Sequence, residues 1–336
     1  MDKKLQDQVF EIILSRFSKK SDAVLALSEL FNVGRDAVYR RMRGDTVLTP
    51  DELKLLATQF NLSLDALIFD KTDTVFFTYN PFSQQINNYN DYLTNVLTDL
   101  QEVKKIPEVS IYYVTEEIPI FYYCFFPKLI AFKLYVWGLT VFDFEYLRKT
   151  PFDFDALSFP DIKLTEAILA NFKTINSTEL WSLNIADNTL NQIEYLFNSG
   201  GFKNAEDAIK VCDTLDELIE HWRAMAEVGR KFLPNSSADS SCGEFSLYHN
   251  EMLVSSSTIL ISSPTIKAVY AIFGNPNFLQ SSDQKLCEFQ EDWFKKAISK
   301  SESISLHAEK KRNWFFNTVK RKVTRVRNRI EGEINE

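Results

Sequence analysis

The 336-residue sequence predicts an all-α domain at its N-terminus, followed by a longer and mainly helical α+β region. Apolar residues recur at helical spacing in five short segments of the first seventy residues. Further along, long helical patterns alternate with short β-branched and aromatic runs. At roughly 150 residues per domain, the length allows two or three domains. We divide the chain into an N-terminal domain (1–70), a linker (71–83), an α+β region (84–306) and a basic C-terminal helix (307–336).

The composition argues against several classes of function. The chain has only 9 Gly, and neither a GxGxxG nor a GxxxxGK[ST] pattern occurs, so we expect no dinucleotide or P-loop site. Its 4 Cys contain no CxxC pair and its 3 His lie far apart, which supplies no recognisable zinc site or His-based triad. We therefore expect no metal and no cofactor, and the sequence names no cofactor-binding residue.

Two further observations predict a cytoplasmic protein. The first residues, MDKKLQDQ, lack the apolar stretch of a signal peptide. The most apolar segment, 118–142, is interrupted by prolines and lysines and is too short to span a bilayer, which needs about 20 apolar residues. We interpret this segment as buried core.

The net charge of −8 is distributed unevenly. Residues 1–70 carry 10 basic and 11 acidic side chains, residues 71–308 carry 19 and 31, and residues 309–330 carry 9 and 1. An acidic body with basic segments near both ends predicts that any polyanion contact uses those segments.

Five helices are expected in the N-terminal domain. Ser21 is expected to cap the second helix, and Thr49 followed by Pro50 is expected to begin the fourth. Between the second and third helices, Asn32, Val33 and Gly34 predict a tight turn, since Asn and Gly tolerate a left-handed backbone. The expected helices cover residues 5–17, 21–31, 35–43, 50–60 and 62–68.

The segment SELFNVGRDAVYRRMRG (28–44), followed by LATQFNLSLDAL (56–67), resembles the lambda-repressor/Cro-type helix-turn-helix domain. It is most similar to the variant at the N-terminus of a group of larger bacterial regulators, and the resemblance covers residues 5–69. Asn32 stands where the family usually has Gly, and Ser28 where it usually has Ala. The resemblance implies a transcription regulator that binds double-stranded DNA through its third helix.

The third helix also carries side chains suited to DNA. Ala37, Val38 and Met42 are expected to face the core, so that the polar residues face outward. Arg can bind guanine O6 and N7, Asp can accept from cytosine N4, and Tyr can contact phosphate or a thymine methyl. The predicted DNA-contacting residues are Lys20, Ser21, Arg35, Asp36, Tyr39, Arg40 and Arg43.

Two alternative functions stay open. The first is an adaptor whose helical domain uses its solvated charges to bind another protein. The second is an enzyme with an appended DNA-binding domain, for which His249 near Glu251 and His221 near Glu220 are the nearest acid–base pairs. Such neighbours arise often by chance, so we assign no catalytic residue.

The α+β region contains two helical seams with alternating steps of three and four residues, at 86–103 and 208–229. Each seam predicts either a bundle core or self-association as a homodimer. Residues 245–305 weakly resemble the effector-binding modules of bacterial regulators, which take a small molecule or a protein, and 282–299 is expected to be helical. Strands are expected at 109–114, 119–126, 180–184, 245–249, 257–262 and 266–273.

The C-terminal segment predicts a basic amphipathic helix over 310–330. Phe316, Val319, Val323, Val326 and Ile330 form one apolar face, and nine basic residues cover the rest. Because an isolated helix of this length is marginal, it needs a surface to cover its apolar face. That surface is the acidic body of the chain, a DNA backbone, or an anionic membrane contacted through Trp314 and Phe315.

Overall fold

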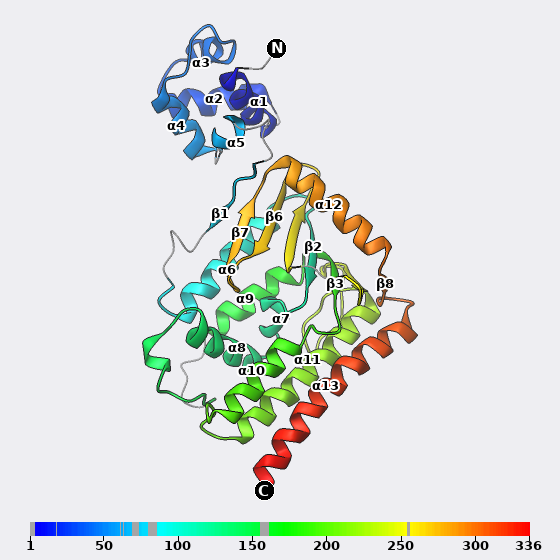
Figure 1. Ribbon diagram of the computed structural model, residues 1–336. Helices are drawn as coiled ribbons and strands as arrows, with labels where there is room; N and C mark the ends of the chain where they lie inside the picture. Colours follow the sequence, from blue (N-terminus) through cyan, green and yellow to red (C-terminus); the bar gives the residue numbers. More distant parts are fainter. Residues whose placement is uncertain are drawn as a thin grey trace. The chain divides into compact units, whose positions relative to one another are not determined.

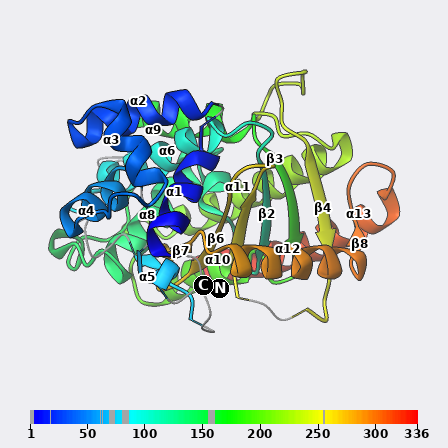
Figure 2. The ribbon, with the colours of Figure 1, turned by 90° about the horizontal axis from the view of Figure 1, so that it is seen from above.

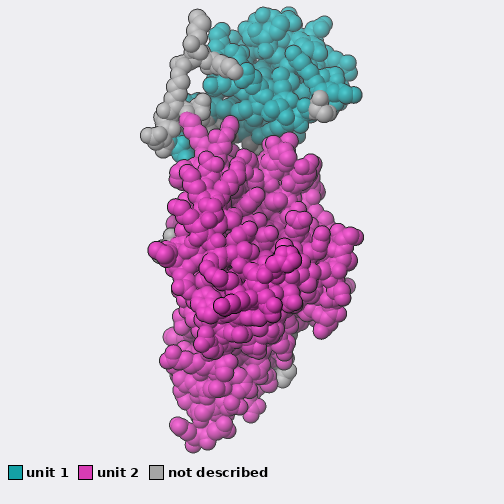
Figure 3. All heavy atoms as spheres, turned by 90° about the vertical axis from the view of Figure 1, so that its right-hand side faces the viewer, with its two compact units in different colours: residues 1–77 teal, residues 78–336 magenta. Residues whose placement is uncertain are grey.

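The computed structural model describes residues 4–17, 19–60, 62, 64–68, 74–79, 86–154, 161–253 and 256–336. The chain divides into two compact units, Met1–Phe77 (unit 1) and Thr78–Glu336 (unit 2), which are coloured separately in Figure 3. The division falls within 71–83, the range expected as a linker, of which only 74–79 is described. Within that range, Thr78 and Tyr79 form a short strand that belongs to unit 2.

Unit 1 is helical at each segment where the sequence predicts a helix (Figure 1). Its core includes Val9, Leu27, Val38 and Leu56, which come from four different helices. A capping box of Thr49 and Glu52 begins the fourth helix as expected. The helices are α1 (Leu5–Ser15), α2 (Lys20–Phe31), α3 (Arg35–Met42), α4 (Pro50–Gln59) and α5 (Leu64–Ile68).

The expected role of Ser21 as a helix cap is wrong. Helix α2 already begins at Lys20, and its N-cap residue is Lys19. Ser21 therefore lies inside the first turn, where its hydroxyl donates to the Asp22 carboxylate at 3.0 Å instead of accepting from the backbone. Only a side chain at the N-cap is placed to accept from the unpaired backbone N–H groups of the first turn. Ser21 lies two residues past the N-cap.

Unit 2 contains a mixed sheet, which gives the α+β class expected for this region. Its described strands follow the order β1-β7-β6-β5-β2-β3-β4-β8. The neighbours β2, β3 and β4 run parallel, and every other pairing is antiparallel. The strands are β1 (Thr78–Tyr79), β2 (Ser110–Thr115), β3 (Asn176–Trp181), β4 (Phe245–His249), β5 (Thr258–Ser262), β6 (Lys267–Ile272), β7 (Phe278–Ser281) and β8 (Glu302–Ser303).

Helices cover both faces of this sheet (Figure 2). On one face, Cys287, Phe294 and Ala297 of α12 pack against Val114, Leu260 and other strand residues. The larger core lies on the opposite face and includes residues of the remaining α-helices of unit 2. The helices are α6 (Tyr89–Lys104), α7 (Ile120–Tyr123), α8 (Pro127–Thr140), the 3-10 helix η2 (Glu145–Leu147), α9 (Ile162–Phe172), α10 (Asp187–Asn198), α11 (Glu206–Val228), α12 (Gln284–Ser299) and α13 (Glu309–Asn335).

Two of the expected strands differ from the structure. Residues 119–126 form α7 and its flanks rather than a strand, with Tyr122 and Tyr123 both fully buried. An apolar run buried on all sides has no periodicity that separates helix from strand. The expected strand 180–184 is β3 at Asn176–Trp181, which includes the buried polar residues Ser177 and Glu179. Strand β7 and the two-residue strands β1 and β8 were not expected.

Both helical seams lie within the core of unit 2. The α6 seam packs against α9, and the α11 seam packs among α8, α10, β4 and α13. The bundle-core interpretation is therefore confirmed for both segments. Segment 118–142 is likewise buried core, and no helix in the described ranges is long and apolar enough to cross a membrane.

Helix α13 docks on the acidic body of the chain, as one of the three alternatives predicts. It lies along α11 and α10 and buries Phe315, Phe316, Val319, Val323 and Ile330. Its cations pair with acids of those helices: Lys320 with Asp216 (3.1 Å) and Glu220 (2.5 Å), Lys322 with Asp187 (2.8 Å), Arg327 with Asp213 (2.6 Å), and Arg329 with Glu194. Contact with DNA or a membrane remains a prediction, for which Lys310, Arg321, Arg325 and the half-exposed Trp314 remain at the surface.

Candidate functional site

The turn between α2 and α3 forms because Asn32 accepts a left-handed backbone. Its φ and ψ are 52° and 47°, in the region that Asn tolerates better than most residues. The backbone N–H of Val33 donates to the Ser28 carbonyl at 3.1 Å, and the Ser28 hydroxyl donates to the Val33 carbonyl. Gly34 then returns to an extended conformation as the N-cap of α3. The turn thus ends α2 and starts α3 within three residues.

The exposed face of α3 carries the side chains that the sequence analysis places outward. Arg35, Asp36, Arg40 and Arg43 are exposed, whereas Tyr39 is half-buried and packs against the core of unit 1. Val38 is fully buried, and Met42 packs partly buried against the same core. Residues 35, 36, 39, 40 and 43 share one side of the helix, since neighbours on a helix surface are three or four residues apart.

The cations near this face differ in their partners. Arg35, Arg40 and Lys20 form no ion pair or side-chain hydrogen bond with any described residue. Arg43 pairs with Asp45 at 2.9 Å, but both side chains are more than half exposed and exposed pairs are weak. We refer to Lys20, Ser21, Arg35, Asp36, Tyr39, Arg40 and Arg43 as the α3 surface; the structure places these seven residues on α2 and on α3 or its C-cap.

Gln6 of α1 supports the far end of α3, which the sequence analysis did not foresee. Its side-chain amide donates to the carbonyls of Arg41 (2.6 Å) and Thr46 (2.8 Å), and its oxygen accepts from the Leu48 backbone N–H at 2.9 Å. One side chain therefore satisfies three backbone groups around the end of α3 and the loop that follows. These contacts span 35 to 42 residues, and no local pattern signals them.

Unit 2 contains a cavity of about 350 Å³ between α6 and the sheet. Its walls are mainly aliphatic and aromatic, with Trp137, Ile259 and Ile261 among the lining residues. A volume of this size falls within the range of small-molecule sites. The lining comes from α6 and the segment just before it, from α7, α8, β2, β5, β6 and β7, and from the loops that follow β2, α8 and β6.

Glu117 organises one part of the cavity wall. Its Oε1 accepts from Lys133 Nζ and from Asn188 Nδ2, both at 2.6 Å, and its Oε2 accepts from Asn275 Nδ2. Lys133 is fully buried, and the resulting desolvation lowers the pKa of its ammonium while the Glu117 charge acts in the opposite direction. Both carboxylate oxygens of Glu117 are thus engaged by the chain itself.

A second buried charge cluster lies in the core of unit 2. Glu179 accepts hydrogen bonds from Tyr122 (2.7 Å), Ser177 (2.9 Å) and Trp181 (3.0 Å). Lys231 is fully buried over the ring of Phe172, and desolvation lowers the pKa of its ammonium to about 8. Burial raises the pKa of Glu179 despite the nearby Lys231 charge. Neither side chain lines the cavity, and we interpret the cluster as structural.

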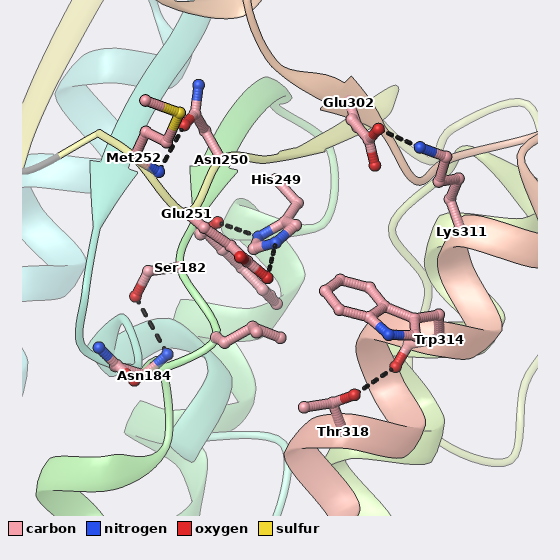
Figure 4. Close-up of polar contacts among 12 residues, drawn as sticks. Ser182, Asn184, His249, Asn250, Glu251, Met252, Glu302, Lys311, Trp314 and Thr318 are labelled. Carbon is pink, nitrogen blue, oxygen red and sulfur yellow. Dashed lines mark hydrogen bonds and ion pairs between the residues drawn. The ribbon is translucent and has the colours of Figure 1, made fainter.

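The two His–Glu neighbours of the sequence analysis have different environments. His249 is buried beneath Trp314, with its Nδ1 3.0 Å from the Trp181 carbonyl and its Nε2 3.6 Å from Glu251 (Figure 4). His221 contacts the Phe232 carbonyl at 2.8 Å, whereas Glu220 pairs with Lys320 and Arg223. Within the described ranges, no group of three or more His, Cys, Asp or Glu side chains could hold a metal.

Comparison with known families found no matching model, and comparisons with curated proteins and with solved structures found no match. The argument for a function therefore depends on the α3 surface and the cavity themselves.

Proposed function

We propose that the chain is a sequence-specific DNA-binding transcription regulator of bacterial type that acts in the cytoplasm. In this proposal α3 is the recognition helix and enters the major groove of double-stranded DNA. The observation that carries it is the exposed face of α3, on which Arg35 and Arg40 have no partner within the described chain. The resemblance of 5–69 to a helix-turn-helix domain supports the same conclusion.

The arrangement suits the chemistry of the major groove. A recognition helix contacts bases mainly through its N-terminal residues, which here include Arg35, Asp36 and Tyr39. Arg35 and Arg40 can donate two hydrogen bonds each to a guanine, and Asp36 can accept one from a cytosine. Lys20 and Ser21 at the start of α2, together with Arg43 at the end of α3, are proposed to contact phosphates.

A homodimer is the expected binding form. One domain of this kind reads only a few base pairs, so two copies on half-sites about one helical turn apart supply the specificity. Unit 2 is proposed to mediate dimerisation or to sense an effector. The α6 seam cannot supply the dimer interface, because unit 2 buries it.

The test begins with selection of duplexes from a randomised DNA pool by the full-length chain, followed by titration of the selected duplex at several salt concentrations. We expect one enriched motif and a linear decrease of log K with log salt, since phosphate contacts release counterions. Lys54→Ala, on α4, is the charge-matched control for Arg40→Ala. A pool without enrichment, together with salt-independent binding, would favour the adaptor function instead.

A further inference from the structure

The cavity of unit 2 combines aromatic walls with a small set of polar groups. Tyr92 contacts Trp137 and Phe142 edge-on or tilted, with ring centroids 5.5 Å apart in both pairs. All three rings line the cavity, as do Tyr113, Tyr270 and Phe278. Aromatic faces carry a negative quadrupole and attract cations, most strongly where water is excluded.

Tyr92 presents its hydroxyl to the cavity and has no hydrogen-bond partner for it among the described residues. Its side chain is only 7% exposed. The hydroxyl oxygen itself keeps surface that water in the cavity can reach. A polar group of a bound molecule could take the place of that water.

Asp99, two turns further along α6, is the second unpaired group of the wall. Its side chain is exposed to solvent, and it forms no ion pair and no hydrogen bond in the described part of the chain. Desolvation by the surrounding protein raises the pKa values of Asp99, Tyr92 and Tyr270, and the Asp99 charge adds to the shifts of the two tyrosines. All three groups line the same cavity.

The charged side chains among the described residues that line the cavity are all acidic. Asp99 and Glu117 are its two carboxylates, and no Lys, Arg or His is among the described residues that line it. Glu117 already accepts from Lys133, Asn188 and Asn275, so that its charge and both its oxygens are engaged. The carboxylate left for a ligand is that of Asp99, which lacks a counter-charge.

We propose that this cavity binds a small apolar molecule that carries one protonated amine. The ammonium group donates to the Asp99 carboxylate, and the apolar body packs against aromatic rings of the wall such as Trp137 and Phe142. An ammonium–carboxylate hydrogen bond is roughly twice as strong as a neutral one, and the aromatic rings add to it. A carboxylate or phosphate ligand would bring a second negative charge beside Asp99 with no cation to offset it.

As the effector site of a regulator, this inference rests on the proposed function. The binding itself does not, because it is measured on the full-length chain without DNA. If the chain binds the amine but no DNA, the cavity assignment stands and the regulator proposal is contradicted. If the chain binds DNA but not the amine, the regulator proposal stands and the cavity assignment is contradicted.

The experiment compares three probes with the same phenylbutyl body: 4-phenylbutylamine, 4-phenylbutanol and 4-phenylbutyrate. Binding to the full-length chain is measured by calorimetry at neutral pH. We expect the amine to bind about tenfold more tightly than the alcohol and the butyrate to bind most weakly. Equal or tighter binding of the butyrate, or no measurable binding of the amine, would overturn the proposal.

Asp99→Asn tests the assigned contact. The variant should lose about tenfold in affinity for the amine and keep its affinity for the alcohol. Glu102→Gln removes a carboxylate from the same helix outside the cavity and should change neither. Ile261→Trp fills the cavity and should abolish binding of all three probes, while circular dichroism confirms the fold. Unchanged amine binding by Asp99→Asn or by Ile261→Trp would contradict the assigned site.

Discussion

Arg41 of α3 donates to one carboxylate oxygen of Glu52 through both Nε (3.0 Å) and Nη2 (2.7 Å). The other oxygen of Glu52 accepts from the Thr49 backbone N–H at 2.9 Å and so completes the cap of α4. These contacts lower the pKa of Glu52 despite its burial. One carboxylate therefore joins two helices and caps the second, whereas Arg40, one residue earlier, is exposed and unpaired in the described chain.

Arg41→Met should destabilise unit 1, and Arg40→Met should not. A hydrogen bond to a charged group contributes about 1.5–3 kcal/mol, and the variant also leaves Glu52 without its counter-charge. Hydrogen exchange of the α3 and α4 amides in the full-length chain measures this locally. Faster exchange in Arg40→Met than in Arg41→Met would show that the two roles are assigned the wrong way round.

Arg35→Ala and Arg40→Ala should each weaken binding to the selected duplex by about 1–3 kcal/mol and relax sequence preference at one position. Arg43→Ala should weaken binding to all sequences about equally, since its proposed partner is a phosphate. Titrations of the selected duplex and of single-base variants distinguish these outcomes. Wild-type affinity and preference in all three variants would contradict the proposed docking of α3.

The helices of unit 1 could be predicted because their signals are local. Asn32, Gly44 and the Thr49–Pro50 pair mark helix ends through the conformation of a few neighbouring residues. The side-chain contacts that join the helices could not be predicted, because Gln6 and Glu52 bind partners outside their own helices. The exposed side of α3 followed from periodicity, whereas Ser21 was misplaced because α2 begins one residue earlier.

Val323→Asp should detach much of α13 from α11 and α10. Val323 is buried, and the substitution removes apolar burial of about 1.5–3 kcal/mol and adds a desolvated charge. We expect faster amide exchange throughout 309–335. Thr324→Asp adds the same charge at the neighbouring exposed position and should leave exchange nearly unchanged.

Neutralising the ion pairs of α13 should have a smaller effect than Val323→Asp. Lys322→Gln and Arg327→Gln each remove partly exposed pairs, which contribute about 0–1 kcal/mol apiece. The same exchange measurement compares them directly. If the two Gln substitutions opened α13 as far as Val323→Asp does, charge rather than apolar packing would hold the helix.

His221→Gln should make unit 2 less sensitive to mild acid. Burial lowers the pKa of folded His221 below its usual value of about 6.5, with the Phe232 carbonyl acting in the opposite direction. As pH falls below about 6.5, the unfolded chain takes up this proton before the folded one, so the free energy of unfolding decreases. Because the variant lacks this histidine, its free energy of unfolding should decrease less than that of the wild type between about pH 7 and pH 5. Urea titrations at each pH measure that free energy.

Tryptophan fluorescence reports this transition for unit 2 alone, because all 5 Trp residues of the chain lie beyond residue 77. The comparison is the difference between wild type and variant at each pH, which cancels the titration of other groups. A difference that stays constant with pH would contradict the assignment to His221.

The α+β class of unit 2 could be predicted from the sequence, but only some of its helices and strands could. Strands β4, β5 and β6 follow the expected ranges because their apolar and β-branched runs are bounded by turn residues. Strand β3 was displaced because Glu179, a residue typical of surfaces, lies in the core with its own hydrogen-bond partners. The cavity could not be predicted, since lining residues as distant in sequence as Asp99 and Tyr270 share one cavity only when α6 packs against the sheet.

The pairing of α11 with α13 has a consequence during synthesis. Lys320 and Glu220 are separated by 100 positions, and a ribosome adds about 5–20 residues per second. The apolar side of α11 that α13 covers therefore stays open for about 5–20 s after α11 itself is made. Unit 1 consists of Met1–Phe77, so it can fold before α11 and α13 are synthesised. At that stage the nascent chain has a folded unit 1 and an incompletely folded unit 2. We expect chaperones to bind to the nascent chain at this stage.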